Sequence, residues 1–281
     1  MSYPTIATFV HREPAPGKAL EAALDLARQF DAHLHIVAPG LDRTEPGFYY
    51  AGAHAVAVRE NQENARDEAR ILSESISKRM KGETVRWDME DRVVQASALS
   101  DHIAERVRLS DLVVLDAPYS EKSVSEEIAA LEATLFRARA PALVIPADMG
   151  GAVGLTPKRI LLAWNESDEA LRACRSAFPF LKSADDTEIA IIDPPRHPSG
   201  LTDPGGALAS YLARHSIPAE ISVLARTETD IADILIRHAN ESGAGMIVMG
   251  AYGHTRLREA IIGGATRHML ERANMPVLMA R

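Results

Sequence analysis

Short runs of apolar and β-branched residues alternate along this chain with longer segments whose apolar residues recur every three or four positions. The short runs are typical of strands, and the longer segments are typical of helices that bury one face. Their alternation predicts βαβ units, and hence an α/β fold with parallel sheets. In the first half we expect strands at 5–10, 34–38, 84–89, 112–115 and 142–145, and helices at 17–30, 58–80, 97–108 and 125–138.

The second half repeats this order of elements. The segment DLVVLD at 111–116 aligns with GMIVMG at 245–250, and the closing segments 134–146 and 268–280 each combine a helix, a proline and a final apolar strand. A duplicated unit explains both matches. In this half we expect strands at 159–163, 188–192, 220–224, 246–249 and 277–279, and helices at 167–181, 206–215, 229–240 and 264–272.

Two separate sheets fit this repeat better than one continuous sheet of ten strands. We therefore predict two tandem five-stranded parallel-sheet domains, at residues 1–147 and 159–281. The glycine-rich stretch at 148–158 has no apolar period and is the predicted linker.

Composition narrows the classes of function. The chain has 281 residues and a net charge of −8, with no cluster of Lys and Arg, so we expect no nucleic-acid binding. No apolar run approaches the ~20 residues that span a bilayer. The first residues also lack the charged leader and cleavage site of a secretory signal. Cys174 is the only cysteine, which excludes an internal disulfide and fits a cytoplasmic protein; we expect it to be buried in a helix.

An insertion at 40–82 separates the second and third strands expected in the first half. It contains an aromatic and glycine cluster, GFYYAGAH, at 47–54. We interpret it as a surface loop that leads into a long helix with a charged, solvated face, and a binding lid is the alternative.

The segment GAYGHTRLREAIIGGAT at 250–266 carries the clearest chemical signal. It begins directly after an expected buried strand and ends where a helix is expected. Glycines at such a junction let backbone N–H groups approach an anion, and the helix adds its positive end. Such a junction suits a di- or triphosphate, and a turn that merely connects strand to helix is the alternative. The P-loop, GxGxxG, GxSxG and HExxH motifs are absent, which removes the main support for NTPase, dehydrogenase, serine hydrolase and zincin functions.

The spacing of this segment resembles the nucleotide-binding signature of the universal stress protein family. Gly250 is followed after two residues by Gly253, and after nine more by Gly263 and a small residue. The resemblance implies a Rossmann-like, adenine nucleotide alpha hydrolase-like fold in tandem copies. It also implies a stress-response protein whose cofactor is ATP, with or without Mg²⁺.

The resemblance assigns site residues in the second half by position. Asn165 stands where the family usually has an Asp, and Gly264 replaces the usual Ser or Thr. The adjacent Trp164 either stacks on a base or fills the core. Ile191 falls where an apolar residue contacts adenine. The ribose and phosphates are assigned to Gly250, Gly253, Gly263, Gly264, Ala265 and Thr266, with His254 beside them.

The first half has lost this signature. Asp116 stands where Gly250 does, and His11 takes the place of Asn165. The carboxylate would repel phosphate, so we expect ATP to bind only in the second half. By resemblance, the first half pairs with the second through their last strands.

Three classes of function remain open at this stage. The first is a nucleotide-dependent regulatory protein, which binds an adenine nucleotide and protein partners and can form a homodimer. The second is a slow ATPase, although we assign no catalytic residue. The third is a nucleotide-free interaction scaffold. Among the ten histidines, His33 and His35 share one face of a strand near His11, which permits metal binding; a set of polar or half-buried histidines is the simpler interpretation, and we assign no metal ligand.

Overall fold

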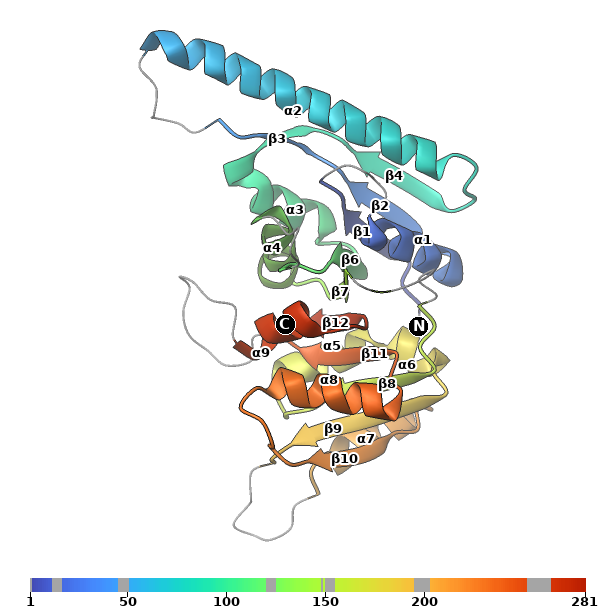
Figure 1. Ribbon diagram of the computed structural model, residues 1–281. Coiled ribbons are helices and arrows are strands. Elements are labelled where there is room, and N and C mark those ends of the chain that lie inside the picture. The colour runs from blue at the N-terminus through green and yellow to red at the C-terminus, as the bar shows by residue number, and fades with distance from the viewer. Residues whose placement is uncertain are drawn as a thin grey trace. The chain divides into compact units, whose positions relative to one another are not determined.

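The computed structural model describes residues 2–11, 17–44, 51–119, 125–147, 149, 155–194, 203–251 and 264–281. Contacts divide the chain into two compact units, each of which is described by itself (Figure 1). The amino-terminal unit comprises residues 3–116 and 124–140, and the carboxyl-terminal unit comprises 117–123 and 141–281 together with the first two residues.

The amino-terminal unit contains a parallel sheet with the strand order β4-β2-β1-β6 and a small parallel sheet of β3 and β5. Its elements are β1 (Thr5–Phe9), α1 (Lys18–Phe30), β2 (His33–Val37), β3 (Gly40–Asp42), α2 (Ala51–Met80), β4 (Arg86–Glu90), β5 (Val93–Gln95), the 3₁₀ turn η1 (Ala96–Ala98), α3 (Leu99–Val107), β6 (Leu112–Asp116), α4 (Ser125–Glu132) and the π-helical turn η2 (Ala133–Ala138).

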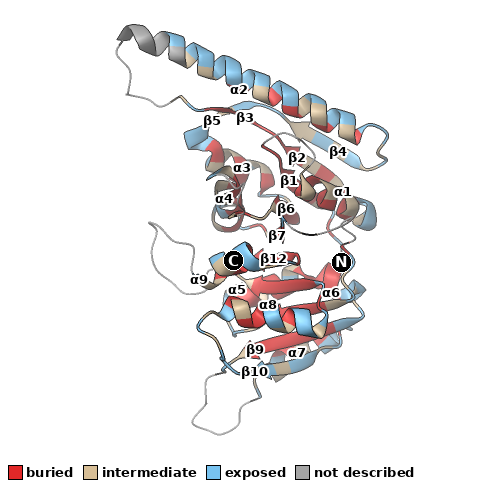
Figure 2. Cartoon of the chain, viewed as in Figure 1, coloured by how far each residue is buried: buried red, intermediate tan, exposed pale blue. Residues whose placement is uncertain are grey.

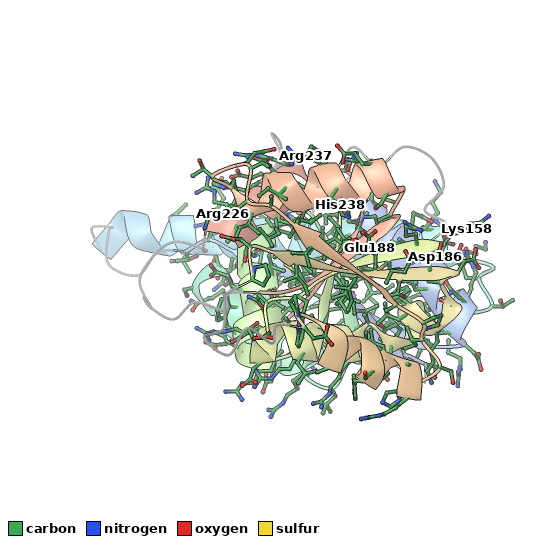
Figure 3. The ribbon with its side chains drawn as sticks, turned by 90° about the horizontal axis from the view of Figure 1, so that it is seen from below. Lys158, Asp186, Glu188, Arg226, Arg237 and His238 are labelled. Carbon is green, nitrogen blue, oxygen red and sulfur yellow. The ribbon has the colours of Figure 1, made fainter. Side chains whose placement is uncertain are left out.

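The carboxyl-terminal unit contains five parallel strands in the order β10-β9-β8-β11-β12. Helices cover both faces of this sheet: Figure 3 shows α8 on one side and α7 on the other. The elements are β7 (Ala142–Ile145), β8 (Arg159–Ala163), α5 (Asp168–Ser176), α6 (Phe178–Ser183), β9 (Asp186–Ile192), α7 (Gly206–Arg214), β10 (Glu220–Leu224), α8 (Ile231–Ser242), β11 (Met246–Gly250), α9 (Gly264–Arg272) and β12 (Val277–Ala280).

The last strand of the first repeat belongs to the second unit. β7 pairs antiparallel with β12, with Val144 opposite Val277 and Ala142 opposite Met279. The repeat alignment places β7 in the first half, whereas the contacts group it with 141–281. The pairing of β7 with β12 is the expected pairing of the last strands of the two repeats.

The insertion at 40–82 is more ordered than the sequence indicates. α2 begins at Ala51, where the apolar pattern predicts a helix only from 58, and β3 and β5 were not predicted. Gly40 explains how α2 can lie so close to β3, because a Cβ at this position would come within 1.9 Å of the Ala65 carbonyl oxygen. A glycine is thus required there by the approach of two backbones.

The central strands of both units form their cores, and Figure 2 shows them as buried. Cys174 on α5 has no exposed surface, and burial raises the pKa of its thiol to about 12, as expected for a structural cysteine. Among the described residues, no helix combines the length and the hydropathy needed to cross a membrane.

A buried carboxylate links three strands to α8 in the carboxyl-terminal unit (Figure 3). Glu188 on β9 is 6% exposed, and its Oε1 accepts a hydrogen bond from Ser222 Oγ at 2.5 Å and lies 2.6 Å from His238 Nε2. Arg159 on β8 lies 3.7 Å from its Oε2. Burial alone would raise the pKa of Glu188, but the bonds from Ser222 and His238 and the charge of Arg159 outweigh it, so that the pKa lies below its ordinary value of 4.5.

This lowered pKa predicts a pH dependence of stability. Because folding lowers the pKa of Glu188, its contribution to the free energy of unfolding is complete above the unfolded value, near 4.5, and is lost as pH falls through the folded value. We expect Glu188→Gln to make the free energy of unfolding of the carboxyl-terminal unit less dependent on pH between about pH 5 and pH 3. Urea unfolding at each pH measures this free energy. Equal pH slopes in the variant and the unmodified protein would contradict this account.

Candidate functional site

The carboxyl-terminal unit has a reversal of strand order between β8 and β11. From β8 the chain moves to β9 on one side, and it later returns to β11 on the other side. Ligands of open α/β sheets bind in the crevice that such a reversal leaves beyond the carboxyl ends of the strands. Trp164 and Asn165 follow β8, and Gly250 ends β11, so the fold brings these three predicted residues to one sheet edge.

Gly250 has a packing role that the sequence does not reveal. A Cβ at this position would lie 2.6 Å from the backbone nitrogen of Ala170 and 2.9 Å from the Cβ of Glu169. Both belong to the first turn of α5, which packs against β11. The glycine therefore lets the end of β11 and the start of α5 come together.

Asn165 organises the start of α5. Its Oδ1 accepts hydrogen bonds from Ser167 Oγ at 2.7 Å and from Ser167 N at 3.2 Å. Ser167 is the N-cap of α5, and its hydroxyl oxygen accepts from Ala170 N at 3.1 Å. The intervening Glu166 has a φ of 63°, a left-handed conformation that makes this turn tight. The side-chain oxygen of Asn165 is thus already engaged in the turn, which leaves its amide group as the donor for a ligand.

Trp164 and Ile191, the two residues predicted near the base, differ in how far they are buried. Trp164 is half-buried, and its backbone N–H extends the pairing of β8 with β9 by bonding the Ala190 carbonyl oxygen at 2.9 Å. Ile191 is only 5% exposed. Its Cδ1 would lie 2.7 Å from a Cβ at Gly205, the N-cap of α7, whose φ of 89° also favours glycine. Ile191 is therefore covered by the start of α7.

The first turn of α9 carries the last three residues of the predicted motif that the structure describes. Gly264 is exposed, and within the described part of the chain a Cβ there would meet no atom closer than the His268 ring at 3.9 Å. Ala265 is half-buried, and Thr266 is 5% exposed. The free backbone N–H groups at this helix start suit an anion. The other predicted residues, Gly253, His254 and Gly263, lie outside the described residues.

The same turn carries cationic side chains that motif reasoning missed. Arg267 places its guanidinium 5.1 Å above the Tyr119 ring and donates to Glu271 Oε1 at 2.6 Å. His268 contacts Asp230, the N-cap of α8. In the sequence, the Arg-His pair directly after Thr266 is the signal that could have identified these side chains.

The amino-terminal unit has the corresponding crevice between β1 and β6, and the chain's own carboxylate fills it. Asp116, at the end of β6, accepts a hydrogen bond through Oδ1 from Ala19 N at 2.9 Å, in the first turn of α1. Its Oδ2 would lie 2.7 Å from a Cβ at Gly17, the N-cap. A negative charge at this position also complements the helix dipole.

A cavity of about 10 Å³ beside Asp116 is too small for more than a water molecule. His11 and Glu127 line it and are 8% and 5% exposed, with His11 Nε2 and Glu127 Oε1 3.7 Å apart. The carboxylates of Asp116 and Glu127 thus both line this small cavity in the first half.

The other histidines do not join His11. His33 Nε2 and His35 Nδ1 lie 2.6 and 2.9 Å from the two carboxylate oxygens of Asp88 on β4. Burial would raise the pKa of Asp88, but these two hydrogen bonds outweigh it and lower the pKa. Within the described ranges, no group of three or more His, Cys, Asp or Glu residues is arranged to hold a metal ion.

These features define an α/β protein of the class whose parallel sheets carry ligand crevices at their carboxyl edges. Residues 156–281 match the sequence model of the Universal stress protein family. Residues 156–281 therefore form a domain of the universal stress protein type.

Two relatives match short segments of the chain. A universal stress protein of Methanocaldococcus jannaschii is 32% identical over 47 residues, which is 17% of this chain and 29% of the relative. One of Synechocystis sp. is 33% identical over 49 residues, which is 17% of each protein.

Solved structures match the whole chain. A universal stress protein of Archaeoglobus fulgidus has a TM-score of 0.72 and 14% identity, covering 98% of this chain and 96% of the other. A putative universal stress protein of Pseudomonas aeruginosa has a TM-score of 0.59 and 17% identity, covering 98% and 92%. At these identities the likeness establishes the fold alone.

Proposed function

We propose that this protein binds ATP through its carboxyl-terminal half and acts as a nucleotide-dependent regulatory protein in a stress response. The observation that carries the proposal is the exposed start of α9 at Gly264, in the unit whose strand order reverses between β8 and β11. The motif spacing at 250–266 and the family match of residues 156–281 support it.

The residues present fit the proposed ligand. Phosphates would be held by the backbone N–H groups at the start of α9, with Arg267 as the nearest added cation on that helix. Mg²⁺, where present, would bind mainly through phosphate oxygens and water. The amide of Asn165 would donate to the ribose or phosphates, and Trp164 offers a half-buried ring to the base.

One ligand per chain follows from the difference between the two crevices. Gly250 places no side chain at the end of β11, whereas Asp116 places a carboxylate at the start of α1. Bound ATP would stabilise the carboxyl-terminal half. It would also change the interactions of this half with partners if two conformational states of the protein bind ATP with different affinities.

The test is the amount of nucleotide that the freshly purified protein releases on denaturation, identified by chromatography. We expect about one adenine nucleotide per chain, and a rise in melting temperature when ATP is added to the emptied protein. A value near two would contradict the closed crevice of the first half. No released nucleotide together with no thermal shift would overturn the proposal and leave an interaction scaffold as the better account.

A further inference from the structure

Tyr119 links the loop that follows β6 to α9 of the carboxyl-terminal unit. The repeat alignment that matches 111–116 with 245–250 places Tyr119 opposite Gly253, the second glycine of the motif. The guanidinium carbon of Arg267 on α9 lies 5.1 Å from the centroid of the Tyr119 ring. Contacts assign residues 117–123 and 141–281 to the same compact unit, so the two residues meet within one unit although they come from different repeats.

The backbone of Tyr119 has a conformation that favours glycine. Its φ is 74°, in the left-handed region that a bulky residue adopts only at a cost in free energy. The residues before it are anchored, since Ala117 N donates to the Ile145 carbonyl oxygen at 2.9 Å and Pro118 is buried. Such a conformation persists where the surrounding structure fixes it. The first repeat therefore combines a glycine-like turn with an aromatic ring at this position of the motif.

Arg267 is the cation that this ring restrains. It lies on α9, three residues after Gly264, with which the helix begins. Its Nε donates to Glu271 Oε1 at 2.6 Å, a bond that does not use the two terminal amino groups of the guanidinium. Half of the arginine side chain is exposed. A guanidinium at this distance is attracted by the face of a tyrosine ring. Tyr119 and Glu271 together thus limit the conformations of a long side chain that would otherwise be free to rotate.

We propose that Tyr119 is a positioning residue for the nucleotide, which restrains Arg267 so that its charge adds to the start of α9. The inference rests on the proposed function, and it gives the first repeat a part in the site of the second. A side chain that is already restrained loses less conformational entropy when it binds a phosphate. The benefit should grow with the number of phosphates on the ligand, which a merely structural role of Tyr119 would not produce.

Isothermal titration of the full chain with ATP and with AMP tests the proposal. Tyr119→Leu keeps an apolar side chain at the same φ but removes the ring, so it should weaken ATP binding about threefold and AMP binding less. The conservative variant Tyr119→Phe keeps the ring and should retain most of the affinity. Tyr119→Gly suits the left-handed backbone. It should therefore fold with little change in urea midpoint and still lose as much ATP affinity as Tyr119→Leu.

A double-mutant cycle tests whether Tyr119 acts through Arg267. Arg267→Gln alone should weaken ATP binding about tenfold, because it removes a charged donor. It should also make the affinity less dependent on salt. In this background, Tyr119→Leu should cause no further loss, since the cation that it restrains is absent.

The outcomes separate this inference from the proposed function. Suppose that the unmodified protein binds ATP. The positioning role is then overturned if Tyr119→Leu binds ATP as tightly, if it loses ATP and AMP equally, or if its loss adds in full to that of Arg267→Gln. The proposed function would stand in each of these cases. An unmodified protein that binds no ATP overturns both.

Discussion

Gly250→Ala is expected to destabilise the carboxyl-terminal unit by about 3 kcal/mol. The added methyl group would stand 2.6 Å from the backbone nitrogen of Ala170 and 2.8 Å from the backbone carbon of Glu169. Backbone atoms in the first turn of a helix cannot rotate away as a side chain can. Either β11 or α5 must shift, which would disturb the N-cap that Ser167 and Asn165 build.

Urea unfolding measures this loss, and the thiol of Cys174 reports it independently. Cys174 lies on α5 with no exposed surface, so a thiol reagent should label it faster in the variant. Gly264→Ala is the matched control, because no atom of the described residues lies closer than 3.9 Å to a Cβ there, and it should leave both measurements nearly unchanged. Equal losses in the two variants would mean that the glycines serve one common role and that the close packing at Gly250 does not matter.

The two glycines show what the sequence motif can and cannot distinguish. The spacing of 250–266 assigns both to phosphate binding, because a pattern of glycines shows only where side chains are absent. The structure separates them: Gly250 accommodates α5, whereas a Cβ at Gly264 would meet, among the described residues, only the His268 ring at 3.9 Å. The difference arises from how α5 crosses β11, a long-range packing that no local pattern encodes.

The sequence predicts those parts of the fold in which strands and amphipathic helices show a regular spacing of apolar residues. The strands predicted for the second half appear within two residues of their expected starts. Four of them, β8, β9, β11 and β12, are mainly buried runs, whereas β10 is mostly exposed. β3 and β5 escaped prediction because three residues carry no readable period. The helix α2 was predicted to be too short, since its first turns lack an apolar stripe. The helix expected at 167–181 is divided into α5 and α6, with Pro179 in the first turn of α6.

The candidate site stays a prediction, but the places of some of its residues can be compared with the sequence. Parallel topology brings Trp164, Asn165 and Gly250 to one edge, as the motif requires. Burial of Ile191 beneath Gly205 could not be foreseen, because it depends on the left-handed turn before α7. Charge repulsion by Asp116 predicts that the first half binds no phosphate, and the bond from Ala19 adds a second argument for this prediction: the start of α1 already has an acceptor.

Gly263→Val is expected to weaken ATP binding at least ~100-fold while the protein stays folded. Gly263 immediately precedes α9 in the sequence, and in the proposed complex the phosphates approach the N–H groups at that helix start. A branched side chain there would occupy the volume of the phosphates. Isothermal titration with ATP measures the loss, and the urea midpoint verifies that folding is intact.

The adjacent position supplies the opposite expectation. Gly264→Ser restores the hydroxyl that related motifs carry, and the described residues leave room for it, since none of their atoms would come closer than 3.9 Å to a Cβ there. The serine hydroxyl can donate one more hydrogen bond to a phosphate oxygen, so ATP should bind several-fold more tightly. If Gly263→Val retained the original affinity, the phosphates could not lie at the start of α9. If instead both variants lost ATP equally, the glycines would control the conformation of the segment before α9, and direct contact with phosphate would not explain the motif.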